Sequence, residues 1–110
     1  MKQGEIWYAN LDPIKEQEQS GFRPVVIVSG NLLNTYLHLV ICCPLTTKIK
    51  NYKGNVVLQP TKNNKLKQAS EILVFHVRSI SKDRLTKKIG EISEQEIKSI
   101  KKTINELLDY

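Results

Sequence analysis

Apolar residues in this chain gather in short runs that polar and turn-forming residues separate, a pattern typical of a small β-rich domain. The runs predict strands over residues 5–11, 25–28, 37–43, 54–58, 71–77 and 89–92. Residues 31–36 are expected to link the second strand to the third. Pro44 is expected to end the third strand, just before Thr46 and Thr47. Short strands with turn signals between them predict a mainly β fold, a small barrel or sandwich.

The only helix predicted lies at the C-terminal end. Ser93 and Glu96 have the spacing of a capping box. The apolar residues that follow recur at helical spacing: Ile97, Ile100, Ile104, Leu107 and Leu108. We expect this face to pack on the sheet and the opposite, lysine-bearing face to be solvated.

Length and composition indicate one domain over residues 1–110. The chain has 110 residues, of which 40% are hydrophobic, enough for a single core. No stretch approaches the ~20 consecutive apolar residues of a membrane span, and no hydrophobic segment follows Met1 as in a signal peptide. We therefore expect a cytoplasmic protein.

The cysteines predict neither a disulfide nor a metal site. Cys42 and Cys43 are adjacent on a predicted strand, so their side chains should point to opposite faces. Only His38 and His76 could join them, which does not give the four spaced ligands of structural zinc. No metal or other cofactor is expected.

The charge distribution favours a polyanionic partner. The formal net charge is +6, and residues 19–70 contain no carboxylate. Seven basic residues lie in that segment: Arg23, Lys48, Lys50, Lys53, Lys62, Lys65 and Lys67. Such a one-signed segment suits nucleic acid or an acidic protein tail. A lysine-rich solvated surface is the alternative interpretation.

Two predicted strand ends carry groups suited to phosphate. Arg23 follows a long polar loop and precedes the second strand, while Thr46 follows the third. A guanidinium binds phosphate oxygens in a bidentate way, and a threonine hydroxyl can donate to the same group. The sequence has no phosphate-binding glycine loop, no HExxH motif and no carboxylate cluster for paired metal ions. Cleavage of RNA requires none of these motifs, because the 2′-OH of the RNA itself can attack the adjacent phosphate.

Several motifs together resemble the MazF/PemK family of toxin–antitoxin endoribonucleases. They are Gly4-Glu5-Ile6-Trp7, Leu11-Asp12-Pro13, Ser20-Gly21-Phe22-Arg23-Pro24, Pro44-Leu45-Thr46-Thr47 and the segment 78–85, followed by the terminal helix. The resemblance covers nearly the whole chain. It implies an SH3-like β-barrel of about five to seven strands with a C-terminal helix, and a homodimer. It also implies cleavage of single-stranded mRNA to 2′,3′-cyclic phosphate and 5′-hydroxyl ends, and neutralisation by an acidic antitoxin.

The resemblance also implies the site residues. Arg23 and Thr46 match the catalytic pair, and Glu18 matches a position proposed as a base or an RNA contact. One departure concerns the acid–base pair of PemK-like members, since Leu73 and Phe75 stand at the Arg and Asp positions. The proton acceptor therefore stays open between Glu18, His76 and a solvent molecule held by the site.

Further residues are predicted to contact RNA: Phe22, Thr47, Lys48, Lys50, His76 and Arg78. Arg78 could instead contact a dimer partner. Phe22, Tyr36 and Tyr52 are the loop aromatics on which bases could stack. Two other functions fit the same residues: a non-catalytic toxin of this fold that poisons DNA gyrase, and a basic barrel that binds nucleic acid without cutting it.

Overall fold

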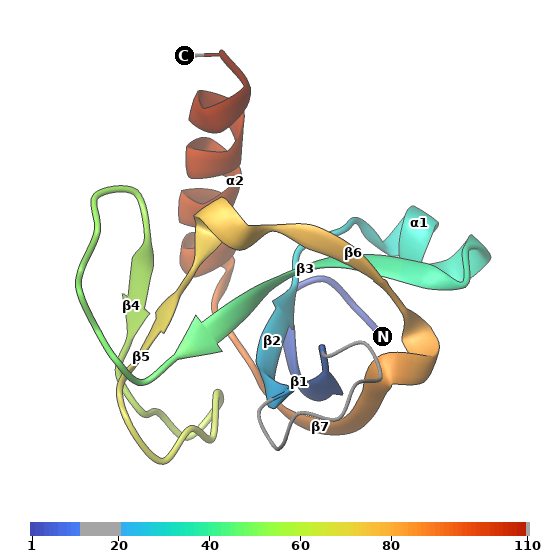
Figure 1. The fold of residues 1–110 in the computed structure, drawn as a ribbon, viewed down its shortest axis with the longest axis horizontal. Coiled ribbons are helices and arrows are strands. Elements are labelled where there is room, and N and C mark those ends of the chain that lie inside the picture. The colour runs from blue at the N-terminus through green and yellow to red at the C-terminus, as the bar shows by residue number, and fades with distance from the viewer. Residues whose placement is uncertain (12–20, 110) are drawn as a thin grey trace.

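The computed structural model describes residues 1–11 and 21–109. Its elements, in chain order, are β1 (Glu5–Asn10), β2 (Phe22–Ile27), α1 (Asn31–Tyr36), β3 (Leu39–Thr46), β4 (Val56–Leu58), β5 (Ser70–Ile72), the 3-10 helix η1 (Val74–His76), β6 (Arg78–Ser81), the 3-10 helix η2 (Lys82–Arg84), β7 (Leu85–Glu91) and α2 (Glu94–Asp109). This confirms the prediction of a mainly β fold with a C-terminal helix (Figure 1).

The strands form one curled antiparallel sheet in the order β4-β5-β3-β2-β1-β7, with β6 paired to β3. The long strand β3 pairs with β2 on one side, and with β6 and then β5 on the other. Pro44 lies where β3 passes from β6 to β5. Its carbonyl accepts from the Leu73 N–H (2.8 Å), so its nitrogen faces the same side, where no ladder bond needs a donor. β3 therefore runs through Pro44 to Thr46, and the prediction that Pro44 ends the strand was wrong.

Alternation along the strands builds two apolar clusters, one on each face of the sheet. Val26, Cys43 and Leu45 belong to the cluster that α2 covers, whereas Val25 and Cys42 belong to the other. The two cysteines therefore point to opposite faces, as predicted, and both are free thiols. Burial raises the pKa of Cys42 to about 11 and that of Cys43 to about 12.

The capping box of α2 is confirmed. The Ser93 N–H donates to Glu96 Oε1 (2.8 Å), and the Glu96 N–H donates to Ser93 Oγ (3.1 Å). Ile97, Ile100 and Ile104 pack on the cluster beneath the helix.

The predicted apolar face of α2 ends before Leu107 and Leu108, which are 41% and 80% exposed. The helix extends beyond the edge of the sheet at this end, as Figure 1 shows, so no strand lies there to cover them. The prediction that these two leucines pack on the sheet was wrong.

Other predicted boundaries also differ. The strand expected over residues 71–77 ends at Ile72 and continues as η1, and the link over residues 31–36 contains the short helix α1. The strand predicted over residues 89–92 is the end of β7, which begins at Leu85. Short apolar runs do not distinguish strand from helical turn without their tertiary partners. None of the helices among the described residues is long and apolar enough to cross a membrane.

Candidate active site

Four strand ends meet at one rim of the sheet. β1 ends at Asn10, β2 begins at Phe22, β3 ends at Thr46 and β5 begins at Ser70. Val25 pairs with Pro44, and this register, continued along both strands, places Arg23 opposite Thr46. Opposed residues of antiparallel strands project their side chains from the same face. The sheet therefore brings together the two residues that the sequence singled out.

A small open pocket of about 300 Å³ lies at this rim. Its lining is Phe22, Arg23, Pro24, Leu45, Thr46, Thr47, Lys48 and Ser70. Five of the predicted site residues share it: Phe22, Arg23, Thr46, Thr47 and Lys48. Among the described residues, the lining contains two cations and no carboxylate, so the pocket suits an anionic ligand.

Within the part of the chain that the structure describes, the Arg23 guanidinium has no competing partner. The side chain is half-buried at the start of β2. No hydrogen bond or ion pair joins it to any residue within 1–11 and 21–109. Its N–H donors are therefore available for a ligand, and the planar fork matches two oxygens of one phosphate.

Thr46 retains a hydroxyl hydrogen for a ligand. Its Oγ1 accepts from the Lys48 N–H (3.1 Å), which closes a tight turn at the end of β3. A hydroxyl both accepts and donates, so the turn fixes the oxygen and leaves the O–H free to point into the pocket.

Glu71, which sequence analysis did not select, holds the loop that follows this turn. Its side chain is fully buried (0% exposed) on β5, opposite Thr46. Oε1 accepts from the N–H groups of Lys50 (2.8 Å) and Asn51 (3.0 Å). Oε2 accepts from the Tyr52 N–H (2.9 Å) and from Asn55 Nδ2 (3.0 Å). One carboxylate thus fixes the path of the chain between β3 and β4.

The four donors also determine the charge state of Glu71. Burial alone would raise its pKa, but the Asn55 amide and the three backbone N–H groups lower it more, so the pKa lies below its ordinary value of 4.5. The carboxylate is therefore ionised at neutral pH. Its sequence signal was a lone acid within an apolar run, at the end of the long carboxylate-free segment.

Three predicted RNA contacts lie outside the pocket. The Lys50 side chain is exposed on the loop held by Glu71. His76 is exposed at the end of η1, and Arg78 is exposed on β6, opposite Cys42. Glu18 falls outside the described residues.

The other predicted positions offer less to the pocket. Tyr36 on α1 and Tyr52 in the loop after β3 are exposed but do not line it. Leu73 is half-buried and Phe75 is exposed, and neither carries an acid or a base. Nowhere in the described part of the chain do three His, Cys, Asp or Glu side chains gather as metal ligands.

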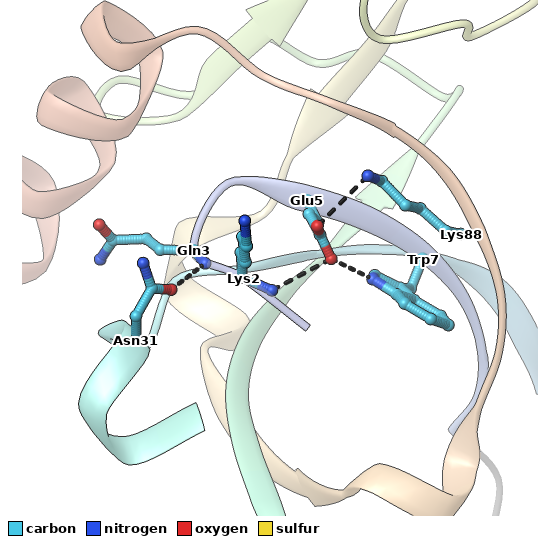
Figure 2. Close-up of polar contacts among 6 residues, drawn as sticks. All are labelled: Lys2, Gln3, Glu5, Trp7, Asn31 and Lys88. Atoms are coloured by element: carbon cyan, nitrogen blue, oxygen red, sulfur yellow. Dashed lines mark hydrogen bonds and ion pairs between the residues drawn. The ribbon is translucent and has the colours of Figure 1, made fainter. Parts of the chain in front are cut away.

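The Gly4-Glu5-Ile6-Trp7 motif has a structural role, which Figure 2 shows. Glu5 Oε1 accepts from the Lys2 N–H (3.1 Å) and from Trp7 Nε1 (2.9 Å), while Oε2 pairs with Lys88 Nζ (3.3 Å). Burial opposes ionisation of Glu5, but the Trp7 and Lys2 hydrogen bonds and the Lys88 charge leave its pKa lowered. These contacts tie the N-terminal segment to β7, away from the pocket.

Comparisons with known proteins point to one family and one fold. A family model described as "PemK-like, MazF-like toxin of type II toxin-antitoxin system" matches residues 2–108. An endoribonuclease MazF from Staphylococcus saprophyticus is 32% identical over 106 residues, which cover 96% of this chain and 88% of that protein.

Solved structures share the fold. MazF from Deinococcus radiodurans superposes with a TM-score of 0.81 at 25% identity, covering 100% of this chain and 97% of the other. Mycobacterium tuberculosis toxin MazF-mt6 gives 0.79 at 23% identity, covering 96% of each chain. A MazE–MazF complex from D. radiodurans gives 0.81 at 22% identity, covering 99% of this chain and 96% of the other.

Proposed function

Since the chain belongs to the PemK-like, MazF-like toxins of type II toxin–antitoxin systems, we propose that it is a metal-independent endoribonuclease that cleaves single-stranded mRNA at a specific sequence in the cytoplasm. The observation that carries this proposal is the convergence of Arg23 and Thr46. Both line one pocket that also contains Lys48, at the rim where β2 begins and β3 ends, and both side chains have N–H or O–H groups available to a ligand.

The reaction uses the nucleophile that RNA itself supplies. The 2′-oxygen forms a bond to the adjacent phosphorus while the bond from phosphorus to the 5′-oxygen breaks. The products are a 2′,3′-cyclic phosphate and a 5′-hydroxyl. The 2′-OH loses its proton to an acceptor, and the 5′-oxygen gains one. The chain must orient the phosphate and stabilise the negative charge that grows on its oxygens.

Arg23 and Thr46 perform these two tasks. The Arg23 fork binds two non-bridging oxygens and stabilises the crowded phosphorane. The Thr46 hydroxyl donates to the same phosphate, and its turn bond to Lys48 keeps it in place. Glu18, His76 and held solvent remain the candidates for the proton acceptor, because Leu73 and Phe75 cannot carry a proton.

The other pocket residues bind the neighbouring nucleotides. Phe22 is 48% exposed at the mouth of the pocket, and an exposed aromatic ring provides a stacking surface for an unpaired base. Thr47 and Lys48 contact the adjoining sugar or phosphate. Lys50, His76 and Arg78 lie farther out and contact RNA beyond the cleaved bond.

Two partners complete the proposal: a second copy of this chain and an acidic antitoxin. The carboxylate-free segment 19–70 supplies the positive charge that an acidic chain requires. The MazE–MazF complex shares this fold. Light scattering after size exclusion should give twice the chain mass for the toxin alone, and a monomer would remove the homodimer from the proposal.

The test is to incubate the protein with a long single-stranded RNA in excess EDTA and map the fragment ends. Discrete cuts with 5′-hydroxyl ends are expected. Loss of one preorganised donor costs about 10²–10³ in rate, so Arg23→Ala and Thr46→Val should each lose at least about a hundredfold. Arg23→Lys keeps the charge but not the fork and is the matched control, with partial activity.

Three results would contradict the proposal. RNA left intact by the folded protein would exclude cleavage, and a gyrase supercoiling assay would then test the non-catalytic toxin. Unchanged cutting by Arg23→Ala would remove the assigned site. Cutting abolished by EDTA and restored by a divalent metal would exclude the metal-independent mechanism.

A further inference from the structure

A second and larger concave surface adjoins the pocket. It has a volume of about 780 Å³ and is lined by Tyr8, Pro24, Lys65, Leu66, Lys67, Gln68, Lys87, Lys88 and Ile89. We call it the lysine groove. Pro24 lines both the groove and the pocket that holds Arg23 and Thr46, so the two concave surfaces are neighbours at β2.

The groove follows a row of paired residues across the sheet. Lys87 pairs with Tyr8, and Tyr8 pairs with Pro24. Tyr8 is 41% exposed, and its ring lies 6.1 Å from that of Phe22, centroid to centroid, at an angle of 36°. Phe22 lines the neighbouring pocket. The two rings therefore form an aromatic surface that joins the groove to the pocket.

The positive charge of the groove is largely uncompensated. Four of its described lining residues are lysines, and none of them carries a carboxylate. Lys88 pairs with Glu5. Among the described residues, no ion pair engages Lys65, Lys67 or Lys87. Each such lysine strengthens the binding of a polyanion, because neutralising a phosphate releases its counterions.

The loop between β4 and β5, which carries Lys65 and Lys67 and forms one wall of the groove, is held in place by hydrogen bonds of its own. Asn64 is 2% exposed, and its Oδ1 accepts from the N–H groups of Thr61 (2.9 Å) and Leu66 (3.0 Å). Its Nδ2 donates to the Gln59 carbonyl (2.9 Å). These bonds fix the loop between β4 and β5 before any ligand arrives.

The same wall is docked on β7. The Glu91 N–H donates to the Asn63 carbonyl (3.1 Å). Gly90 makes this approach possible, because a Cβ at that position would lie 2.4 Å from the Asn64 carbonyl oxygen. Backbone contacts therefore fix the position of this loop, which carries Lys65 and Lys67, relative to β7.

We propose that the lysine groove binds the segment of RNA that flanks the phosphate held by Arg23 and Thr46. The lysines would contact its backbone, and Tyr8 would stack on one of its bases. This inference rests on the proposed function. An acidic peptide could also bind the lysines, but its carboxylates would not stack on the aromatic surface that Tyr8 and Phe22 form beside the phosphate pocket. Single-stranded nucleic acid has both phosphates for the lysines and bases for the aromatic rings.

The test compares two triple variants that remove the same charge. Lys65→Ala/Lys67→Ala/Lys87→Ala removes three of the four lysines that line the groove. Lys98→Ala/Lys101→Ala/Lys102→Ala removes three lysines from the exposed outer face of α2. Each is assayed on a long RNA of about 20 nucleotides and on a short one of about five, both containing the mapped cleavage site. Binding is measured by fluorescence anisotropy with RNA that carries 2′-deoxyribose at that site, so that it is not cut.

The groove variant should raise the KM for the long RNA at least tenfold with kcat retained. It should also lower the slope of log Kd against log salt by about two, since each lost contact to a single strand contributes about 0.7. Cleavage of the short RNA and all properties of the α2 variant should be unchanged. Tyr8→Leu, which keeps the charge, should weaken binding of the long RNA about fivefold or more.

Equal KM values for the groove variant and the α2 variant on the long RNA would overturn the inference. So would a groove variant that binds the long RNA normally but no longer binds a polyglutamate peptide, because the groove would then serve an acidic protein. If the wild type cuts no RNA, the proposed function fails separately. The anisotropy series, then run with unmodified single-stranded RNA of about 20 nucleotides, still decides the groove: selective loss of binding in the groove variant supports it, and absence of binding by the wild type overturns it.

Discussion

Replacing Glu71 by glutamine should be the most informative single change outside the pocket. The side chain keeps its shape, but one carboxylate oxygen becomes an NH₂ group. In one orientation this group faces the N–H groups of Lys50 and Asn51, and in the other it faces the Tyr52 N–H and Asn55 Nδ2. Either way, two donors lose their acceptor and meet another donor.

The magnitude follows from those two donors. Leaving a buried donor unsatisfied costs about 1–3 kcal/mol. The loop can turn part of its backbone toward water, which favours the lower end of that range. We therefore expect Glu71→Gln to lower the free energy of unfolding by about 2–4 kcal/mol. With a urea m value of about 2 kcal/mol per molar, the unfolding midpoint should fall by about 1–2 M.

The pH dependence gives an independent check. The folded state lowers the pKa of Glu71 below 4.5, so its ionisation stabilises the fold above that pH, and this contribution is lost as the pH falls through the folded-state pKa. The stability difference between wild type and Glu71→Gln should therefore be constant above about pH 5 and shrink in more acidic solution.

Urea unfolding at pH 7 and pH 3.5 measures both effects. Glu106→Gln, the same chemical change on the exposed part of α2, is the control and should shift the free energy by less than about 0.5 kcal/mol. A Glu71→Gln protein as stable as this control, or a difference that grows in acid, would refute the assignment of Glu71 as the ionised anchor of the loop.

Two substitutions and one labelling experiment test other parts of the fold. Gly90→Ala should destabilise the protein by about 1–3 kcal/mol in urea and raise the KM for long RNA without altering charge, because the new Cβ displaces the Asn64 loop; normal values would mean that the loop adapts. Ser93→Ala should cost about 1 kcal/mol through loss of the cap on α2, and an unchanged midpoint would contradict this. Cys42 and Cys43, with pKa values of about 11 and 12, should react with a thiol reagent at pH 8 only after unfolding, and rapid labelling of the native protein would show that they are accessible.

The sequence predicted the elements whose apolar residues form a clear run or follow a helical period. β1 and β2 were found because apolar residues gather there in short runs, and α2 was found because its apolar positions recur at helical spacing. β6 was missed, since Ile80 is its only buried residue. The first half of β7 was missed for a similar reason, because exposed residues, Lys87 and Lys88 among them, follow Leu85. Edge strands with one solvated face carry too weak a pattern to be recognised alone.

Prediction of the site likewise succeeded where a residue stands next to an apolar run and failed where its role depends on strand pairing. Arg23 and Thr46 stand next to apolar runs, so their place at strand ends could be inferred. Their mutual approach depends on the pairing of β2 with β3, which a single sequence does not specify. The roles of Glu71 and of the Tyr8–Lys87 row depend on register as well. These roles could be recognised only in the structure, where strands distant in the chain lie side by side.

The position of β1 in the sheet has a consequence for synthesis. Of the strands in this sheet, β1 leaves the ribosome first, yet one of its two neighbours is β7, and Glu5 pairs with Glu91. Contacts so distant in sequence form late and slow folding. A nascent chain that stops before β7 exposes β1 as an open edge, which invites proteolysis or pairing with other chains. It also lacks Lys87, so the lysine groove is complete only once β7 has been made.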